Sequence, residues 1–152
     1  MDSDLSQSRF VEVLLVEDNK HDVFLTEQAF KQSRIAIKMH NVRNGLECLA
    51  YLRKEGKYEN VKTPDLILLD LNMPLMDGRE VLQEISNDPE LNHLPVVILT
   101  TSEDEKDVYK MYRLRCSSYI VKPVDFNQFV RVLNELSIYW FTVVALPPES
   151  GK

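Results

Sequence analysis

The segment between Pro64 and Pro74 limits the possible folds of this chain more than any other. Leu66–Leu69 is a run of four apolar residues, and Asp70 follows it directly. An apolar run this short predicts a strand that is buried on both faces of a parallel sheet. Open α/β sheets carry their functional sites at the carboxyl ends of such strands. Asp70 is therefore a candidate site residue, although on this segment alone a solvated turn residue is the simpler interpretation.

The rest of the chain alternates between strand and helix patterns. Helical apolar spacing follows each of the five predicted strands, which lie at residues 10–16, 35–42, 66–69, 96–99 and 117–121. This alternation predicts a parallel sheet with helices on both faces. The strand at 35–42 alternates polar and apolar residues, as an edge strand does. The predicted fold class is α/β: a flavodoxin-like, doubly wound three-layer sandwich of five helices and a five-stranded parallel sheet in the order 2-1-3-4-5.

Length and composition predict a single globular domain. The chain has 152 residues, of which 44% are hydrophobic and 28% are charged, and these values are ordinary for a globular protein. We expect a flexible N-terminus at residues 1–9, a domain at residues 10–140, and an apolar C-terminal extension and tail at residues 141–152.

Charge and cysteine content limit the classes of binding partner and the cellular compartment that we expect. The formal net charge of −6 argues against nucleic acid as a partner. Cys48 and Cys116 are too few for a disulfide framework, which favours free thiols and a cytoplasmic location. No signal peptide is recognisable and no apolar run approaches the length of a bilayer span, so we expect no membrane association.

Polar residues follow four of the predicted strands. Right-handed parallel topology brings these strand ends to one edge of the sheet, which would gather Glu17, Asp18, Asp70, Thr100 and Lys122. Three neighbouring carboxylates repel one another unless a cation neutralises them. Carboxylate and backbone carbonyl oxygens suit Mg²⁺, and the carbonyl of Asn72 could supply a further ligand.

The same edge carries the groups that phosphoryl transfer requires. Lys122 and the Thr100 hydroxyl are suitable donors to a phosphoryl group. Asp70 could then act as the nucleophile, as in aspartyl-phosphate chemistry.

Each of these residues also has a simpler interpretation. Glu17 and Asp18 could charge a helix start. Thr100 could cap a helix, and Lys122 could be a solvated lysine of an edge strand. A separate simple explanation for the residues at every one of these strand ends would be an improbable coincidence. The combination therefore favours the functional interpretation.

The resemblance to a known family rests on these residues and on one longer motif. Glu17-Asp18, Asp70, Thr100 and Lys122-Pro123, each after its own strand, resemble the site of a response-regulator receiver domain of two-component signalling. Residues 70–78, which include Met73-Pro74 and Asp77-Gly78, are similar to the most recognisable segment of that family. The resemblance covers residues 10 to 140.

This resemblance implies a phosphoacceptor signalling protein, not an enzyme with a separate substrate. Asp70 would take a phosphoryl group from a phosphohistidine on a sensor histidine kinase. The protein would catalyse this transfer and its own dephosphorylation. Mg²⁺, or Mn²⁺ or Ca²⁺ in its place, would be held by Glu17, Asp18, Asp70 and the Asn72 carbonyl, and Lys122 would pair with the phosphate.

The resemblance also implies a conformational switch. Thr100 would move toward the phosphoryl group, and Tyr119, three residues before Lys122, would turn inward. The alternative for Tyr119 is a packing residue of an edge strand, which strand propensity alone would explain.

Backbone features of the site are implied in the same way. The backbone of Leu71, Asn72 and Thr101 would contact the phosphoryl group, and the Lys122–Pro123 bond would be cis. Asn72 and Ser102 flank the site and would tune the rate of hydrolysis. Thr101 departs from the commonest pattern of the family, in which a smaller residue is usual, so its side chain leaves less room for the phosphoryl group.

The C-terminal segment is more apolar than a surface helix requires. Residues 138–147 are apolar nearly all round, which predicts a homodimer through the last helix and its extension. The alternative is that the tail folds back on its own domain. Because the chain ends soon after its fifth helix, we expect a stand-alone receiver that signals through changed protein–protein contacts.

The same ending narrows the family. With the loop at residues 56–60, the ending from Tyr139-Trp140 to Leu146-Pro147 is similar to the small response regulators of bacterial and cyanobacterial phytochromes. This similarity implies a phytochrome kinase as the phosphodonor and a role in light signalling.

Three other functions remain as alternatives. The first is a receiver-like adaptor that is never phosphorylated. The second is an aspartate-nucleophile phosphatase, but Asp70-Leu71-Asn72 lacks the second acid that such an enzyme needs. The third is a flavodoxin-type electron carrier, but Glu17-Asp18 would repel the phosphate that the loop after its first strand has to bind.

Overall fold

The computed structural model describes residues 10–33, 35–123 and 125–138. A parallel sheet with the strand order β2-β1-β3-β4-β5 forms its centre. The strands are β1 (Val11–Val16), β2 (Ile37–Val42), β3 (Leu66–Leu69), β4 (Val96–Thr100) and β5 (Ser118–Val121). Every residue of β3 and β4 is buried, as expected for central strands covered on both faces. The predicted topology is confirmed.

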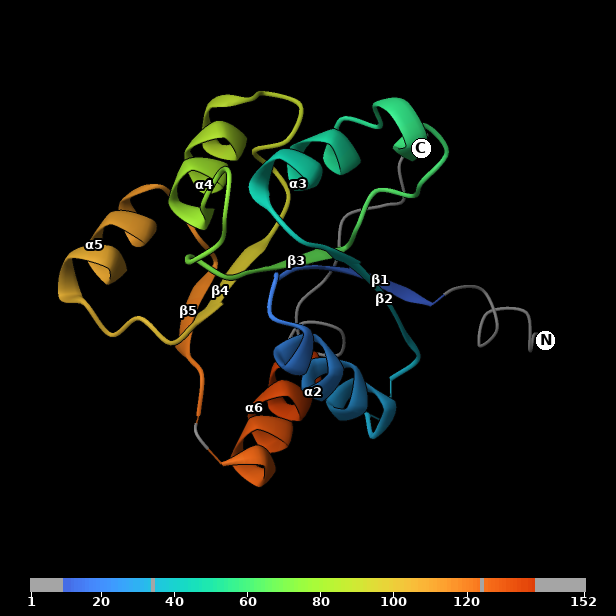
Figure 1. Ribbon diagram of the computed structural model, residues 1–152, viewed down its shortest axis with the longest axis vertical. Coiled ribbons are helices and arrows are strands. Elements are labelled where there is room, and N and C mark those ends of the chain that lie inside the picture. The colour runs from blue at the N-terminus through green and yellow to red at the C-terminus, as the bar shows by residue number, and fades with distance from the viewer. Residues whose placement is uncertain (1–9, 34, 124, 139–152) are drawn as a thin grey trace.

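Helices cover both faces of this sheet (Figure 1). α2 (Lys20–Lys31) and α6 (Phe126–Ile138) pack on one face. The other face carries α3 (Gly45–Leu52), α4 (Gly78–Asn87) and α5 (Glu105–Arg113). Each layer of helices buries a separate apolar cluster against the sheet. The predicted three-layer sandwich is therefore confirmed, with five α-helices in the described part of the chain.

Side-chain caps fix where the helices begin. Asn19 caps α2 by accepting a hydrogen bond from the backbone N–H of Asp22 at 3.0 Å. Asp104 caps α5 through the N–H of Lys106 at 2.9 Å. α5 therefore begins later than Thr100, and Thr100 is the last residue of a buried strand, not a helix cap.

The loop before β3 is more ordered than its polar sequence indicates. It contains the short 3₁₀ helix η1 (Gly56–Tyr58). The ring of Tyr58 packs 5.2 Å from that of Tyr51, and its hydroxyl donates a hydrogen bond to Glu47 Oε1 at 3.1 Å. These contacts hold the loop against α3.

Several predictions concern the two ends of the chain. The expectations for the N-terminus (1–9) and for the C-terminal extension and tail (141–152) lie outside the described residues, as does the apolar ending that predicts a dimer. None of the helices within residues 10–33, 35–123 and 125–138 has the length and apolar character to cross a bilayer.

Candidate functional site

Strand register brings the predicted site residues to one edge of the sheet. Val16 pairs with Leu69, so Glu17 and Asp70 each follow the last residue of neighbouring strands. Thr100 is the last residue of β4 and pairs with Val121 of β5, directly before Lys122. The carboxyl ends of four parallel strands therefore meet as the topology requires.

An acidic cluster forms at this edge. Carboxylate oxygens of Glu17, Asp18 and Asp70 all lie within 4.8 Å of one another. Glu17 and Asp70 are 2% and 7% exposed, and buried carboxylates this close are stable together only with a cation or a proton. Their oxygen donors suit a hard divalent cation, so the residues present fit such an ion.

Burial also changes the acid–base behaviour of this cluster. Burial raises the pKa of Glu17 to about 6, against the opposing effect of the nearby Lys122 ammonium. The negative charge of Asp70 raises it further. An additional cation at the cluster would therefore stabilise the ionised form of Glu17.

Lys122 is paired within the protein. Its Nζ donates to Glu17 Oε1 at 2.5 Å and to Asp22 Oδ2 at 2.8 Å. Burial alone would lower the pKa of Lys122, but the hydrogen bonds to Asp22 and Glu17 raise it overall. Lys122 is thus a buried, charged member of the site, and the interpretation as a solvated edge-strand lysine is wrong.

Asp22 is a functional candidate that sequence reasoning missed. It lies in the first turn of α2, where an acid normally indicates only a favourable interaction with the helix dipole. The available signal was its position one turn after Asn19, which turns its side chain back toward the strand edge.

The loops after β3 and β4 carry the remaining predicted residues. Thr100 is fully buried and Leu71 is buried, whereas Asn72 and Thr101 are exposed. Gly78 explains how the loop after Asp70 folds so tightly: its N–H donates to the Leu71 carbonyl at 2.9 Å. A Cβ at Gly78 would collide with the backbone carbonyl oxygen of Asp70.

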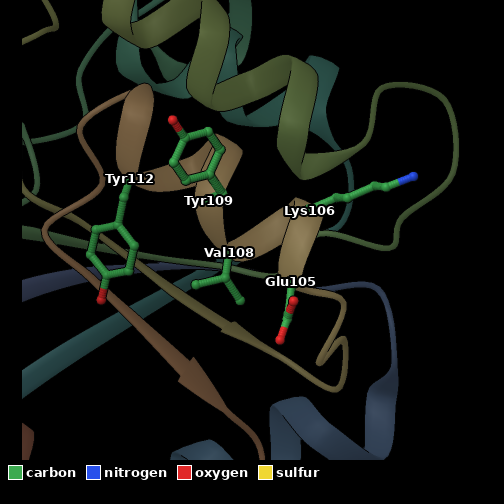
Figure 2. A pocket seen from close by; sticks show the side chains of 5 residues that line it. All are labelled: Glu105, Lys106, Val108, Tyr109 and Tyr112. Atoms are coloured by element: carbon green, nitrogen blue, oxygen red, sulfur yellow. The ribbon is translucent and has the colours of Figure 1, made fainter.

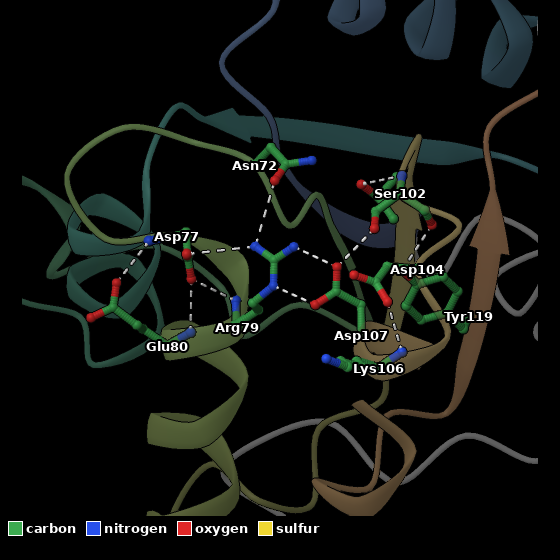
Figure 3. Close-up of polar contacts among 10 residues, drawn as sticks. Asn72, Asp77, Arg79, Glu80, Ser102, Asp104, Lys106, Asp107 and Tyr119 are labelled. Atoms are coloured by element: carbon green, nitrogen blue, oxygen red, sulfur yellow. Dashed lines mark hydrogen bonds and ion pairs between the residues drawn. The ribbon is translucent and has the colours of Figure 1, made fainter. Parts of the chain in front are cut away.

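Tyr119 contacts the loop after β4. Its hydroxyl donates to the backbone carbonyl of Ser102 at 2.9 Å, and the ring is partly buried against the apolar cluster on the face of α3, α4 and α5. Ser102 Oγ donates to Asp107 Oδ2 at 2.7 Å, and Asp107 is paired with Arg79 (Figure 3). No sequence signal identified Arg79 or Asp107, because the two residues lie 28 positions apart in the chain, on different helices.

One backbone expectation is wrong. All peptide bonds within the described ranges are trans, so the Lys122–Pro123 bond is not cis. A trans bond is the lower-energy form for most prolines, and the resemblance alone predicted the exception.

A cavity of about 390 Å³ opens beside the site. Lys122, Thr101 and Pro123 line it from the strand edge, and His21 and Phe126 line it from α2 and α6. A group that enters this cavity would therefore meet the Lys122 side of the acidic cluster.

Comparison with known proteins agrees with this geometry. The response regulator receiver domain matches residues 13–134. The response regulator Rcp1 of Synechocystis sp. is 42% identical over 135 residues, which span 89% of this chain and 92% of Rcp1.

Solved structures give the same result. The crystal structure of the phosphorylated cyanobacterial phytochrome response regulator RcpA has a TM-score of 0.88 and 43% identity, covering 92% of this chain and 100% of RcpA. The Mn²⁺-bound form of Rcp1 has a TM-score of 0.85 and 42% identity, covering 90% of this chain and 99% of that one. This chain therefore belongs to the response regulator receiver domain family and is related to the phytochrome response regulators.

Proposed function

We propose that the chain accepts a phosphoryl group on Asp70 from a phosphohistidine of a sensor histidine kinase. One observation carries this proposal: an acidic cluster, a buried ammonium and a buried hydroxyl meet at one strand edge, with carboxylate oxygens within 4.8 Å of one another. A receiver needs these groups together, because phosphoryl transfer depends on charge neutralisation and positioning.

The roles follow from chemistry and position. An Asp70 oxygen attacks the phosphorus, the bond from phosphorus to the donor imidazole breaks, and the imidazole takes up a proton as it leaves. Glu17, Asp18, Asp70 and the Asn72 carbonyl would hold Mg²⁺, which when bound would neutralise the charge that builds up on the phosphoryl oxygens. A Mn²⁺-bound relative supports a divalent cation here, and Mn²⁺ or Ca²⁺ could substitute.

Lys122 and Thr100 then recognise the transferred group. Lys122 exchanges Glu17 or Asp22 for a phosphoryl oxygen, and the Thr100 hydroxyl and the backbone of Leu71, Asn72 and Thr101 donate to the others. Movement of Thr100 alters the contacts of Ser102 with Thr100 and with Tyr119, whose ring already lies partly buried, and so changes the surface that partners meet. Hydrolysis of the acyl phosphate by water at the same site returns the protein to its resting state.

The direct test uses acetyl phosphate as a small phosphodonor. Intact-mass spectrometry should detect one added phosphoryl group in the presence of Mg²⁺ and none in the presence of EDTA. Asp70→Asn should remain unmodified, whereas Asp65→Asn, at the opposite end of β3, should be modified like the wild type. A chain that is never modified under these conditions would instead be the non-phosphorylated adaptor, and steady release of phosphate from a phosphate ester would indicate the phosphatase.

We further propose that the phosphodonor is a phytochrome-type kinase and that the output is light signalling. The support is the similarity to RcpA, a cyanobacterial phytochrome response regulator. Rapid transfer from a phosphorylated phytochrome kinase to Asp70, with little transfer from an unrelated kinase, is the expected result. Equal transfer from both kinases would remove this assignment.

We also propose a homodimer through α6 and the C-terminal extension. The apolar sequence of residues 138–147 supports it, because one helix face alone would not bury them. Light scattering with and without phosphorylation tests it, and a monomer at high concentration in both states would contradict it.

A further inference from the structure

The ammonium of Lys122 has two carboxylate partners, and only one of them belongs to the acidic cluster. Nζ donates to Glu17 Oε1 at 2.5 Å and to Asp22 Oδ2 at 2.8 Å. Glu17 lies with Asp18 and Asp70 in the set of carboxylates whose oxygens are within 4.8 Å of one another, and Asp22 is not a member of that set. A divalent cation at the cluster would therefore bind Glu17 and leave Asp22 with Lys122.

Asp22 is held in place independently of the acidic cluster. It lies in the first turn of α2, where its backbone N–H donates to Asn19 Oδ1 at 3.0 Å and its carbonyl accepts the Thr26 hydroxyl at 2.8 Å. Its side chain is 30% exposed, against 3% for Glu17, and access to water reduces the desolvation penalty of a carboxylate. The position of Asp22 therefore does not depend on a cation at the cluster.

The Lys122 side chain needs such an anchor. A lysine has a flexible four-carbon stem, and fixing that stem costs conformational entropy. If Glu17 were the only partner, a cation that took Glu17 would leave the ammonium without a carboxylate, although the side chain is only 9% exposed. Burial of an unpaired charge is costly. Because Asp22 also accepts from Nζ, Glu17 can turn to a cation without leaving Lys122 unpaired.

We propose that Asp22 is a positioning residue, which keeps the Lys122 ammonium at the strand edge when a divalent cation takes Glu17. The inference rests on the proposed function, in which Lys122 recognises a phosphoryl group on Asp70. An ammonium has three N–H donors, so Lys122 can keep Asp22 and turn the donor released by Glu17 toward a phosphoryl oxygen. Of its two partners, Lys122 therefore gives up Glu17 and retains Asp22.

The first test measures Mg²⁺ affinity with the full chain and needs no phosphodonor. Isothermal titration calorimetry compares the wild type, Asp22→Asn, Lys122→Met and the double variant. We expect Asp22→Asn to weaken Mg²⁺ binding about three- to tenfold, a coupling within the range for residues of one hydrogen-bonded network. In the Lys122→Met background the same substitution should weaken binding by less than about twofold, because no ammonium remains to be held.

Glu105→Gln is the matched control for the loss of one negative charge. Like Asp22, Glu105 is an acid in the first turn of a helix. It lines a separate pocket of about 560 Å³ on α5, together with Val108 and Tyr112 (Figure 2). Glu105→Gln should therefore bind Mg²⁺ as the wild type does.

The second test follows the ammonium itself. NMR of lysine side-chain nitrogens detects an ammonium group only when burial and hydrogen bonds slow the exchange of its protons with water. Wild-type protein should show the Lys122 signal both in EDTA and in Mg²⁺. Asp22→Asn should show it in EDTA, where Glu17 still accepts from Nζ, and should lose it in Mg²⁺. A merely structural role of Asp22 would not make this signal depend on Mg²⁺.

Two results would each overturn the inference. One is an equal loss of Mg²⁺ affinity for Asp22→Asn with and without Lys122, and the other is a Lys122 signal that persists for Asp22→Asn in Mg²⁺. If Lys122→Met fails to fold, the ammonium signal decides, because Asp22→Asn preserves the shape of the side chain. Wild-type protein that binds Mg²⁺ but accepts no phosphoryl group would overturn the acceptor proposal alone, since neither test uses a phosphodonor.

Discussion

The Lys122 ammonium lies 2.5 Å from Glu17 Oε1, with only 9% and 3% of the two side chains exposed. Glu17 also belongs to the acidic cluster with Asp18 and Asp70. A divalent cation at that cluster would thus share Glu17 with Lys122. The site therefore has two sources of positive charge for one set of buried carboxylates.

Replacement of Lys122 by Met should destabilise the metal-free protein by about 3 kcal/mol, because Glu17 would lose the cation that compensates its burial. Mg²⁺ should restore much of this stability. Chemical denaturation in EDTA and in Mg²⁺ measures both effects, and Lys62→Met, at an exposed lysine, should change little. An equal loss in the two conditions would show that the metal and Lys122 do not share Glu17.

The raised pKa of Glu17, about 6 because of burial, predicts a pH effect with a definite sign. The folded, metal-free protein holds this proton more tightly than the unfolded chain does, so its stability should fall as pH rises from about 4.5 to about 6. Over this pH range, deprotonation of Glu17 should lower the free energy of unfolding by about 2 kcal/mol. Glu17→Gln in EDTA should lack this part of the pH dependence, and identical pH profiles for the two proteins would contradict the assignment.

Gly78→Ala should destabilise the fold by about 2–4 kcal/mol, because its Cβ would collide with the backbone of Asp70 and neither backbone can move freely. Gly56→Ala is the matched control. Gly56 has φ +58° and open space around it, so only conformational strain applies, at about 1 kcal/mol. Thermal unfolding compares the two variants, and equal effects would mean that the close approach at Asp70 is unimportant.

The low pKa of Asp107, about 2 and mainly due to the hydrogen bond from Arg79, predicts an acid-labile contribution to stability. A carboxyl with a lowered pKa stabilises the fold above its unfolded pKa, and that stability is lost as pH falls through the folded value. Asp107→Asn should cost about 1 kcal/mol at pH 7, after allowance for solvent screening. The cost should shrink between about pH 4 and pH 2, whereas a constant cost over that range would contradict it. Glu103→Gln, at an exposed position, serves as the control.

Periodicity and strand-end chemistry were enough to predict most of the fold. The apolar runs of β3 and β4 fixed the centre of the sheet, and the alternation in β2 placed it at an edge. The same logic predicted that Glu17, Asp18 and Asp70 converge, because the ends of parallel strands must meet at one edge. Each of these features depends on local patterns repeated along the chain.

Contacts between distant helices could not be predicted in this way. The Arg79–Asp107 pair depends on how α4 and α5 are placed relative to one another, and their charges look like ordinary surface residues in the sequence. Asp22 was missed for the same reason, since its pairing with Lys122 spans 100 residues. The Lys122–Pro123 bond was expected to be cis only because the bond is cis in the family that the sequence resembles. No local feature of the sequence supported that expectation, and the bond is trans.

The central claim is that Asp70 becomes an acyl phosphate when a divalent cation and Lys122 surround it. Borohydride reduces an aspartyl phosphate to homoserine, so peptide mass spectrometry after treatment with acetyl phosphate, Mg²⁺ and borohydride locates the modified residue. Homoserine at position 70 in Mg²⁺, and none there in EDTA, is the predicted result. Homoserine at any other acid, or at none, would contradict the account.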